Sequence, residues 1–134
     1  MQPDFIEHFV RPAGTPPVNG YSHAVLFSGP MVVISGQVPV DADGNVVSKD
    51  DPRAQVRQVF ANLTSALAAA GATMAHVVKL TYFVTDRALL PVLREVRDEY
   101  VDTGRPPASS LVVVAGLVNP DFLVEVEALA ATGD

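Results

Sequence analysis

The sequence predicts an α+β domain in which two helices cover one face of a five-stranded sheet, in the order β-β-α-β-α-β-β. Two segments carry apolar residues at three- and four-residue spacing, which is typical of helices that pack through one side. Five shorter segments are apolar or alternate in polarity, which favours strands. With 134 residues, 49% hydrophobic and 18% charged, the chain has the size and composition of one globular domain, 1–134.

The N-terminal part is predicted to begin without regular structure. Residues 1–20 are rich in proline, glycine and asparagine, and we expect an irregular leader there. Residues 21–27 and 31–38 read as strands on either side of the turn Ser28-Gly29-Pro30, and we expect them to form a hairpin. The Asp-Gly chemistry of residues 41–45 then indicates a tight reversal.

The first helix is expected to begin after Asp50 or Asp51. An aspartate at this place caps free N–H groups, and Pro52 suits the first helical turn. Gly71 follows the last apolar position, where a left-handed C-terminal cap is expected. The predicted buried stripe contains Val56, Val59, Phe60, Leu63, Leu67 and Ala70.

The second helix is expected to run from its cap, Asp86, to about Val101. Pro91 indicates that the regular helix starts later than this cap. Residues 103–107 end the helix, because they contain glycine and two prolines. Its predicted buried stripe contains Leu89, Leu93, Val96 and Tyr100.

Three further strands are expected, at residues 76–85, 108–115 and 123–130. In the last of them Glu125 and Glu127 lie two residues apart, so both side chains point to one face of the sheet. The opposite face of the same strand is apolar, with Val124, Val126 and Ala128.

One face of this sheet is left uncovered by the two helices. If the alternation holds, the uncovered face carries Lys79, Thr81, Phe83, Glu125 and Glu127. A surface that mixes a large aromatic side chain with charges suits a contact between subunits, with polar groups lining a cleft. The pattern therefore predicts a homo-oligomer with its site between protomers.

Composition and charge exclude several classes of function. The net charge of −6 speaks against nucleic acid as a partner, since phosphate binding needs a basic surface. The chain has no cysteine, and its three histidines show no spacing typical of metal ligands, so no metal is predicted. No apolar run reaches transmembrane length and the acidic N-terminus differs from a signal peptide, so a cytoplasmic protein without membrane contacts is expected.

Four motifs, in order and at compatible spacing, resemble those of the YjgF/RidA family across nearly the whole chain. They are Gly20-Tyr21-Ser22-His23-Ala24, Ser35-Gly36-Gln37-Val38-Pro39, residues 78–86 and residues 124–130. The resemblance implies a chorismate-mutase-like α+β fold with two helices on one face, and homotrimers with clefts between subunits. It also implies a cofactor-free imine or enamine deaminase that converts 2-aminoacrylate-type products to 2-oxo acids and ammonia.

The resemblance also assigns roles to single residues. Tyr21 matches a tyrosine that lines the cleft, Gly36 a backbone position near the ligand, and Glu125 the acid that positions or activates the hydrolytic water. Ser109 stands where the family has an arginine that grips the substrate carboxylate, and one hydroxyl does not replace a bidentate guanidinium. Arg105, four residues earlier, is the candidate to compensate by folding back over the cleft.

Each assignment has a structural alternative. Glu125 and Glu127 are also compatible with solvated positions on an edge strand. Tyr21 is compatible with a core aromatic, Ser109 with a position of no function, and Lys79 with a cross-strand pair to a glutamate.

Three functions follow for comparison. The first is a cofactor-free hydrolase that acts on a small molecule through Glu125. The second is a trimer that binds small metabolites without turnover. The third is an endoribonuclease, which the acidic composition disfavours.

Overall fold

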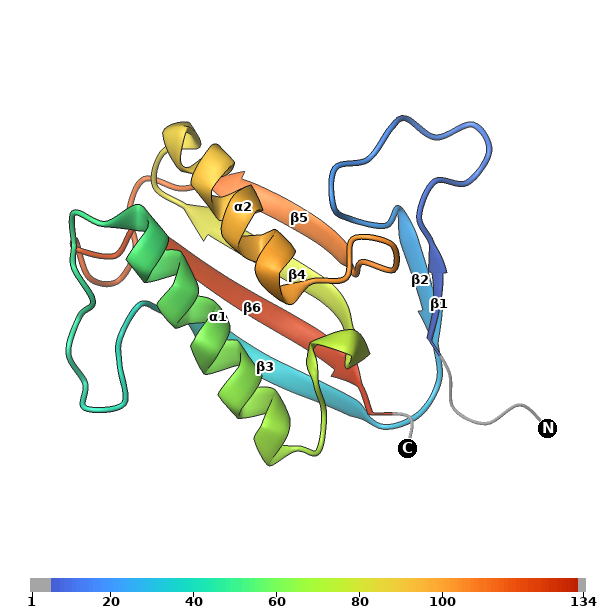
Figure 1. The fold of residues 1–134 in the computed structure, drawn as a ribbon, viewed down its shortest axis with the longest axis horizontal. Coiled ribbons are helices and arrows are strands. Elements are labelled where there is room, and N and C mark those ends of the chain that lie inside the picture. Colours follow the sequence, from blue (N-terminus) through green and yellow to red (C-terminus); the bar gives the residue numbers. More distant parts are fainter. Residues whose placement is uncertain (1–5, 133–134) are drawn as a thin grey trace.

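The computed structural model describes residues 6–132 and confirms an α+β fold with two α-helices (Figure 1). The strands are β1 (Ile6–Phe9), β2 (Ala24–Phe27), β3 (Met31–Gln37), β4 (Val77–Val84), β5 (Ala108–Val113) and β6 (Val124–Ala131). The helices are α1 (Pro52–Ala69) and α2 (Leu90–Tyr100), with short 3₁₀ turns η1 (Met74–His76) and η2 (Arg87–Leu89). None of the helices in this described part is long and apolar enough to cross a membrane.

The main sheet has four strands in the order β3-β6-β4-β5. β6 runs antiparallel to both β3 and β4, whereas β4 and β5 are parallel, as expected for strands joined through a helix. Both α-helices lie on the same side of this sheet (Figure 1), and the apolar core fills the layer between the helices and the sheet. Among residues 6–132 no helix lies on the other side of the sheet.

The predicted hairpin was wrong, and the predicted irregular leader was wrong at residues 6–9, whereas residues 10–20 have no regular structure, as predicted. Residues Ile6–Phe9 form β1, which pairs antiparallel with β2 in a separate two-stranded sheet. β2 is therefore not the hairpin partner of β3, which instead pairs with β6. The predicted strand at 21–27 shortens to Ala24–Phe27 because Ser22 leaves the β1 ladder and forms a parallel bridge with Ala108 at the start of β5.

Helix α1 follows its prediction closely. The Asp51 carboxylate accepts a hydrogen bond of 3.0 Å from the Ala54 N–H, and Gly71 has the left-handed φ of +76° expected after the helix. Ala70 is an exception in the predicted stripe, since it is exposed and caps the helix end. The rest of that stripe is buried: Val56, Val59, Phe60, Leu63 and Leu67.

Helix α2 begins later than its cap, as Pro91 indicates. Asp86 caps η2, with its carboxylate accepting a 2.9 Å hydrogen bond from the Ala88 N–H, and α2 starts at Leu90 with Pro91 in its first turn. Tyr100 near its end stacks on Phe60 of α1 at 5.0 Å between ring centroids. This contact fixes the two helices against each other above the sheet.

The alternation in β4 and β6 is confirmed. Val124, Val126 and Ala128 are buried under the helices, whereas Glu125 is half-buried and Glu127 exposed. In the β4–β6 register Thr81 lies opposite Glu127, and Phe83 lies opposite Glu125. The open face of the sheet therefore carries the mixture of charged and apolar side chains that the sequence predicts.

Candidate functional site

Ser22 brings Tyr21 and Ser109 together, because it joins the N-terminal segment to the residues at the start of β5. The backbone N–H of Ser22 donates to the Pro107 carbonyl at 3.0 Å, and its hydroxyl donates to the Pro106 carbonyl at 2.7 Å. Ser22 is buried, so these bonds are shielded from water. They fix Tyr21 next to the first residues of β5, where Ser109 lies.

A cavity of about 280 Å³, here called the α2 pocket, lies at this place. Ser109 is paired with Leu80 in the parallel β4–β5 register, so its side chain lies on the helix-covered face. The pocket is lined by Asn19, Tyr21, Tyr82, Leu93, Arg94, Arg97, Ser109, Ser110 and Leu111. Two residues that the sequence assigned to substrate binding, Tyr21 and Ser109, thus share one cavity.

Arg97 holds the wall of the α2 pocket in place and was missed by the sequence analysis. Its guanidinium donates to the Asn19 carbonyl at 3.0 Å and to the Asn19 side-chain oxygen at 3.1 Å, and it forms an ion pair of 2.8 Å with Asp98. Gly20 has a left-handed φ of +71°, and a Cβ there would overlap this guanidinium. The helical spacing predicts Leu93 and Val96 in the core but gives no signal that the neighbouring arginine is buried.

Tyr82 forms the buried side of the same pocket. It is 3% exposed, and its hydroxyl is the one buried side-chain polar atom within residues 6–132 that has no hydrogen-bond partner. Burial raises the pKa of Tyr82 far above its ordinary value, so the hydroxyl stays protonated and available as a donor. The alternation of β4 predicts a buried residue here but not an unpartnered hydroxyl.

Gly36 and Glu125 form a second predicted pair, on the open face of the sheet. They lie on the neighbouring strands β3 and β6, beside the irregular register between Ile34 and Gln37. A Cβ on Gly36 would overlap the Glu125 carboxylate, so the backbone of β3 and this carboxylate are in direct contact. Glu125 is half-buried and Glu127 is exposed, which sets the two carboxylates apart.

Lys79 does not pair with a glutamate in the described part of the chain. Its ammonium group donates to the Ser110 hydroxyl at 2.9 Å instead. Lys79 and Glu127, on the neighbouring strands β4 and β6, line a cavity of about 380 Å³ on the open face, together with Val33, Thr81 and Leu129 among others. The open face is thus hollowed as well as mixed in polarity.

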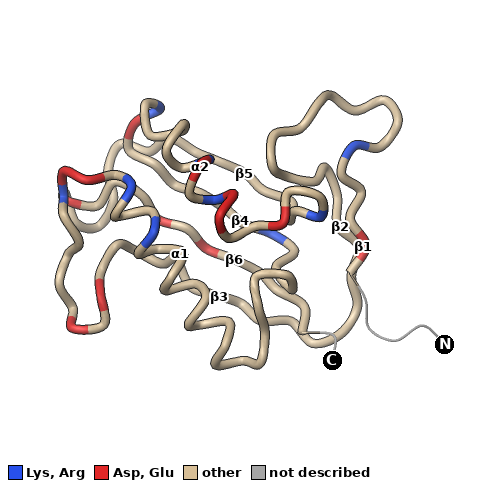
Figure 2. Tube along the Cα trace, viewed as in Figure 1, with Lys and Arg blue, Asp and Glu red and all other residues tan. Residues whose placement is uncertain are grey.

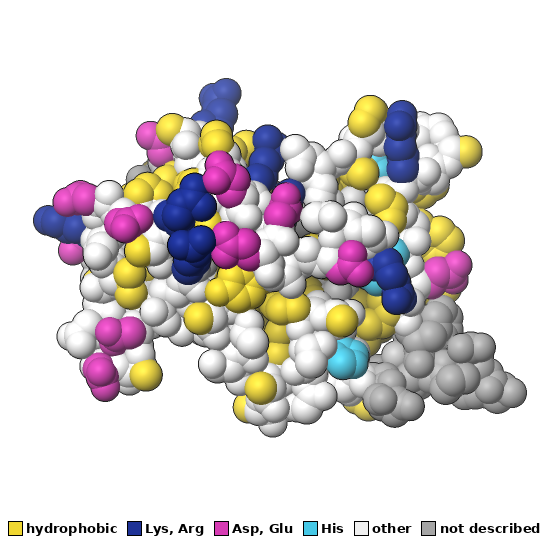
Figure 3. Space-filling view, viewed as in Figure 1, with side chains coloured by type: hydrophobic (Ala, Val, Ile, Leu, Met, Phe, Trp, Pro, Cys, Tyr) yellow, Lys and Arg dark blue, Asp and Glu magenta, His cyan; other side chains and the backbone are white. Residues whose placement is uncertain are grey.

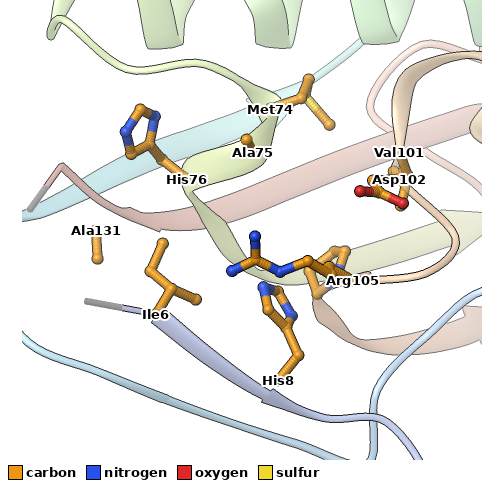
Figure 4. A pocket seen from close by; sticks show the side chains of 10 residues that line it. Ile6, His8, Met74, Ala75, His76, Val101, Asp102, Arg105 and Ala131 are labelled. Atoms are coloured by element: carbon orange, nitrogen blue, oxygen red, sulfur yellow. The ribbon is translucent and has the colours of Figure 1, made fainter.

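Arg105 lies in a different cavity from Ser109. This cavity, of about 230 Å³, is lined by residues of β1, η1 and the loop after α2, including His8, His76 and Asp102. Figure 4 shows the Arg105 guanidinium beside the His8 ring, among the residues that line this cavity. Within one chain, therefore, Arg105 does not fold back to the position that Ser109 occupies.

Each of the three histidine rings forms a hydrogen bond with a backbone group. His8 Nδ1 donates to the Pro106 carbonyl at 2.7 Å, His23 Nε2 donates to the Pro16 carbonyl at 2.9 Å, and His76 Nδ1 accepts from the Thr73 N–H at 2.9 Å. Among residues 6–132 no three His, Asp or Glu side chains are arranged to hold a metal ion.

Charges of both signs are interspersed over the helices, as Figures 2 and 3 show. Arg53 pairs with Glu95 at 2.8 Å and Arg57 pairs with Glu99 at 2.9 Å, each joining α1 to α2. The hydrogen bond from Arg57 lowers the pKa of Glu99 and raises the pKa of Arg57. Paired charges of this kind leave no continuous basic stripe on the helix face for a phosphate backbone.

The fold and the site together define a small α+β protein with ligand-sized cavities on both sides of its sheet. Residues 13–132 match the family model described as Endoribonuclease L-PSP. Protein DfrA of Myxococcus xanthus is 37% identical over 116 residues, which make up 86% of this chain and 87% of that protein.

Solved structures agree with this match. YyfB from Yersinia pestis, described as a protein of unknown function of the conserved Rid protein family, is 35% identical. It superposes with a TM-score of 0.86, covering 94% of this chain and 98% of that one. RidA from an Antarctic Psychrobacter is 31% identical, with a TM-score of 0.71 and coverage of 93% and 99%. The chain belongs to the YjgF/RidA family.

Proposed function

We propose that this protein is a cofactor-free hydrolase of the RidA type, which acts on a small imine, enamine or related metabolite. The observation that carries the proposal is the contact between Gly36 and the half-buried Glu125 carboxylate on the open sheet face. A carboxylate in such a place suits a general base for water. The described residues contain no cluster of side chains that could hold a metal ion, and the chain has no cysteine that could act as a nucleophile.

The proposed site is completed by a second copy of the chain in a homotrimer. Tyr21 and Ser109 lie on the helix-covered side of the sheet, whereas Gly36 and Glu125 lie on the open side. One substrate cannot touch all four residues within a single chain. A cleft between two copies resolves this, because one copy supplies the α2 pocket and the other supplies Glu125.

In the proposed reaction, Glu125 accepts a proton from a water molecule whose oxygen attacks the imine carbon. The C=N bond becomes a C–N single bond, and the proton that Glu125 accepted passes to the nitrogen. The hydroxyl on the tetrahedral carbon then gives its proton to the nitrogen through Glu125, the C–N bond breaks, ammonia leaves and a carbonyl group forms. A positioned base of this kind contributes about 10²- to 10⁴-fold in rate.

The test compares two neighbouring carboxylates on the same strand face. Imines are generated in situ by an amino-acid oxidase, and release of the carbonyl product is followed with and without the protein. Glu125→Gln should lower kcat by about 10²- to 10⁴-fold, because it keeps the shape and removes the base. Glu127→Gln is the matched control and should stay near the wild-type rate. Full activity of Glu125→Gln, or loss in Glu127→Gln alone, would show that the assignment is wrong.

A second candidate function is a trimer that binds metabolites without turnover. It is favoured by Ser109, which stands where the family's deaminases have an arginine: the missing arginine–carboxylate pair weakens recognition of 2-aminoacrylate by about 10- to 100-fold and so lowers its turnover. For the same reason we expect weak activity on 2-aminoacrylate. Measurable binding of small carboxylates together with no turnover of any imine would favour this function.

A further inference from the structure

The cavity of about 230 Å³ that Arg105 lines, here called the Arg105 cavity, is separate from the residues of the proposed site. It lies between β1, η1, the end of β6 and the loop that joins α2 to β5 (Figure 4). Tyr21, Gly36, Ser109 and Glu125 are not among the residues that line it. A ligand in this cavity would therefore be additional to the substrate of the proposed reaction.

Two opposite charges line the Arg105 cavity from a single turn. They belong to Asp102 and Arg105, and the Arg105 N–H donates to the Asp102 carbonyl at 3.1 Å. Although only two residues separate them, their side chains form no ion pair with each other or with any other residue in 6–132. One Asp102 carboxylate oxygen accepts from the Gly104 N–H at 2.9 Å, which leaves the other oxygen for a ligand. The cavity thus offers one cation and one anion, and neither has a charged partner.

Hydrogen bonds fix the wall of the cavity that follows Arg105. His8 Nδ1 donates to the Pro106 carbonyl at 2.7 Å, and the Ser22 hydroxyl donates to the same carbonyl at 2.7 Å. The Ser22 N–H also donates to the Pro107 carbonyl at 3.0 Å. Figure 4 shows the His8 ring beside the Arg105 guanidinium. A wall that is ordered before binding lowers the entropy lost when a ligand binds.

The charges of the lining select the kind of ligand. A lone anion would be attracted by Arg105 and repelled by Asp102, and a lone cation would meet the reverse. A ligand that carries both charges gains from both side chains. The rest of the lining is mostly apolar, and the volume of about 230 Å³ is below the about 300 Å³ at which pockets for drug-sized ligands begin. The cavity therefore suits a small zwitterion with an apolar part.

We propose that the Arg105 cavity binds a free α-amino acid with a short aliphatic side chain. The carboxylate of the amino acid pairs with Arg105, its ammonium group pairs with Asp102, and its side chain packs on Ile6, Met74 and Val101. One carbon atom joins the two charged groups of an α-amino acid, so a single small molecule presents both charges to one turn. The inference goes beyond the proposed function and does not depend on hydrolysis.

The experiment is a calorimetric titration of the whole chain with L-leucine and two analogues that each lack one of its charges. The analogue 4-methylpentanoate lacks the ammonium group, and 3-methylbutylamine lacks the carboxylate. The wild type should bind leucine at millimolar concentration and each analogue about 10-fold more weakly, the lower end for a charge-assisted hydrogen bond. The lower end applies because Asp102 and Arg105 are both exposed to water.

Variants that each remove one charge should separate the ligands. Asp102→Asn should weaken leucine binding by about 10-fold without weakening 4-methylpentanoate, because a carboxylate that repels this analogue is gone. Asparagine still accepts from the Gly104 N–H, so the turn is kept. Arg105→Gln should weaken leucine by the same factor without weakening 3-methylbutylamine. Asp43→Asn and Arg87→Gln are the matched controls, since both residues are exposed and lie outside the cavity, and they should bind leucine like the wild type.

Three results would overturn the proposal. The first is a wild type that binds no leucine at millimolar concentration, and the second is wild-type leucine affinity in Asp102→Asn or Arg105→Gln. The third is 4-methylpentanoate binding as tightly as leucine, which would indicate a plain anion site. Circular dichroism checks that both variants are folded, and an equal loss of all three ligands in a folded variant would also count against the paired charges. Imine turnover is not part of this measurement, so the proposed function stands or falls separately.

Discussion

At the scale of single residues, two glycines make room for the side chains of the candidate site. Gly36 lies against the Glu125 carboxylate, and Gly20 lies against the Arg97 guanidinium. In each case a Cβ would occupy the space of a charged group. The absence of a side chain on the backbone thus determines where a carboxylate or a guanidinium lies.

Gly36→Ala should therefore act like a loss of Glu125. The overlapped atoms belong to the end of the flexible Glu125 side chain, so the carboxylate moves aside and the fold survives. We expect the melting temperature to stay within a few degrees of the wild type and imine turnover to fall toward that of Glu125→Gln. Gly116→Ala is the control, because a Cβ there meets nothing within 4 Å. Full activity of Gly36→Ala would contradict the contact.

The sequence identified some of these residues and not others, for physical reasons. The motifs were enough to select Tyr21, Gly36, Ser109 and Glu125, and the structure places them as two pairs. Their separation onto two faces depends on the parallel register between β4 and β5, which no local pattern encodes.

At the scale of elements, Gln55 of α1 connects the loops around the start of β6. It is fully buried, and its side-chain amide donates to the carbonyls of Val47 at 3.0 Å and Asp121 at 2.9 Å. Its oxygen accepts a 2.8 Å hydrogen bond from the Leu123 N–H, two residues before Glu125. One helix residue thus ties the loop before α1 to the strand that carries the catalytic candidate.

Gln55→Leu should be strongly destabilising although it introduces an apolar side chain of similar size. It leaves a buried N–H and two carbonyls without their partner, and we expect a loss of about 3 kcal/mol in the free energy of unfolding. Denaturant unfolding measures this, with an unchanged m-value as the sign that the fold is kept. Gln58→Leu, which loses one hydrogen bond to Asn62 of 2.9 Å, should cost far less. Equal losses would refute the special role of Gln55.

The elements that the sequence predicted best are those stabilised by their own pattern. α1 has a cap, a proline and a stripe within one segment, and β4 has a regular alternation. The hairpin of 21–27 with 31–38 failed because the partner of β2 is Ile6–Phe9, on the far side of a loop rich in proline and glycine. The Pro- and Gly-rich stretch drew the prediction toward an irregular leader, although Ile6, His8 and their neighbours alternate in burial as a strand does.

At the scale of the whole molecule, the open sheet face is the feature that one chain does not explain. It exposes Val33 by 73% and Val112 by 45%, next to the half-buried Phe83 and Leu129 and the carboxylates of β6. Apolar side chains gathered around charged ones on an uncovered sheet are typical of a surface that another subunit covers. The proposed trimer would bury this face and join the two halves of the site.

The last prediction follows from that arrangement. Light scattering at micromolar concentration should report three times the chain mass of 14.2 kDa.

Val33→Glu should lower the mass toward that of one chain, because it would place a charge in the buried contact. Its circular dichroism should stay that of a folded protein, since Val33 is 73% exposed in the single chain. Ala61→Glu adds the same charge on the exposed side of α1 and should leave the trimer intact. Dissociation should also abolish imine turnover. A wild-type protein that scatters as a monomer and still hydrolyses imines would rule out a site shared between copies.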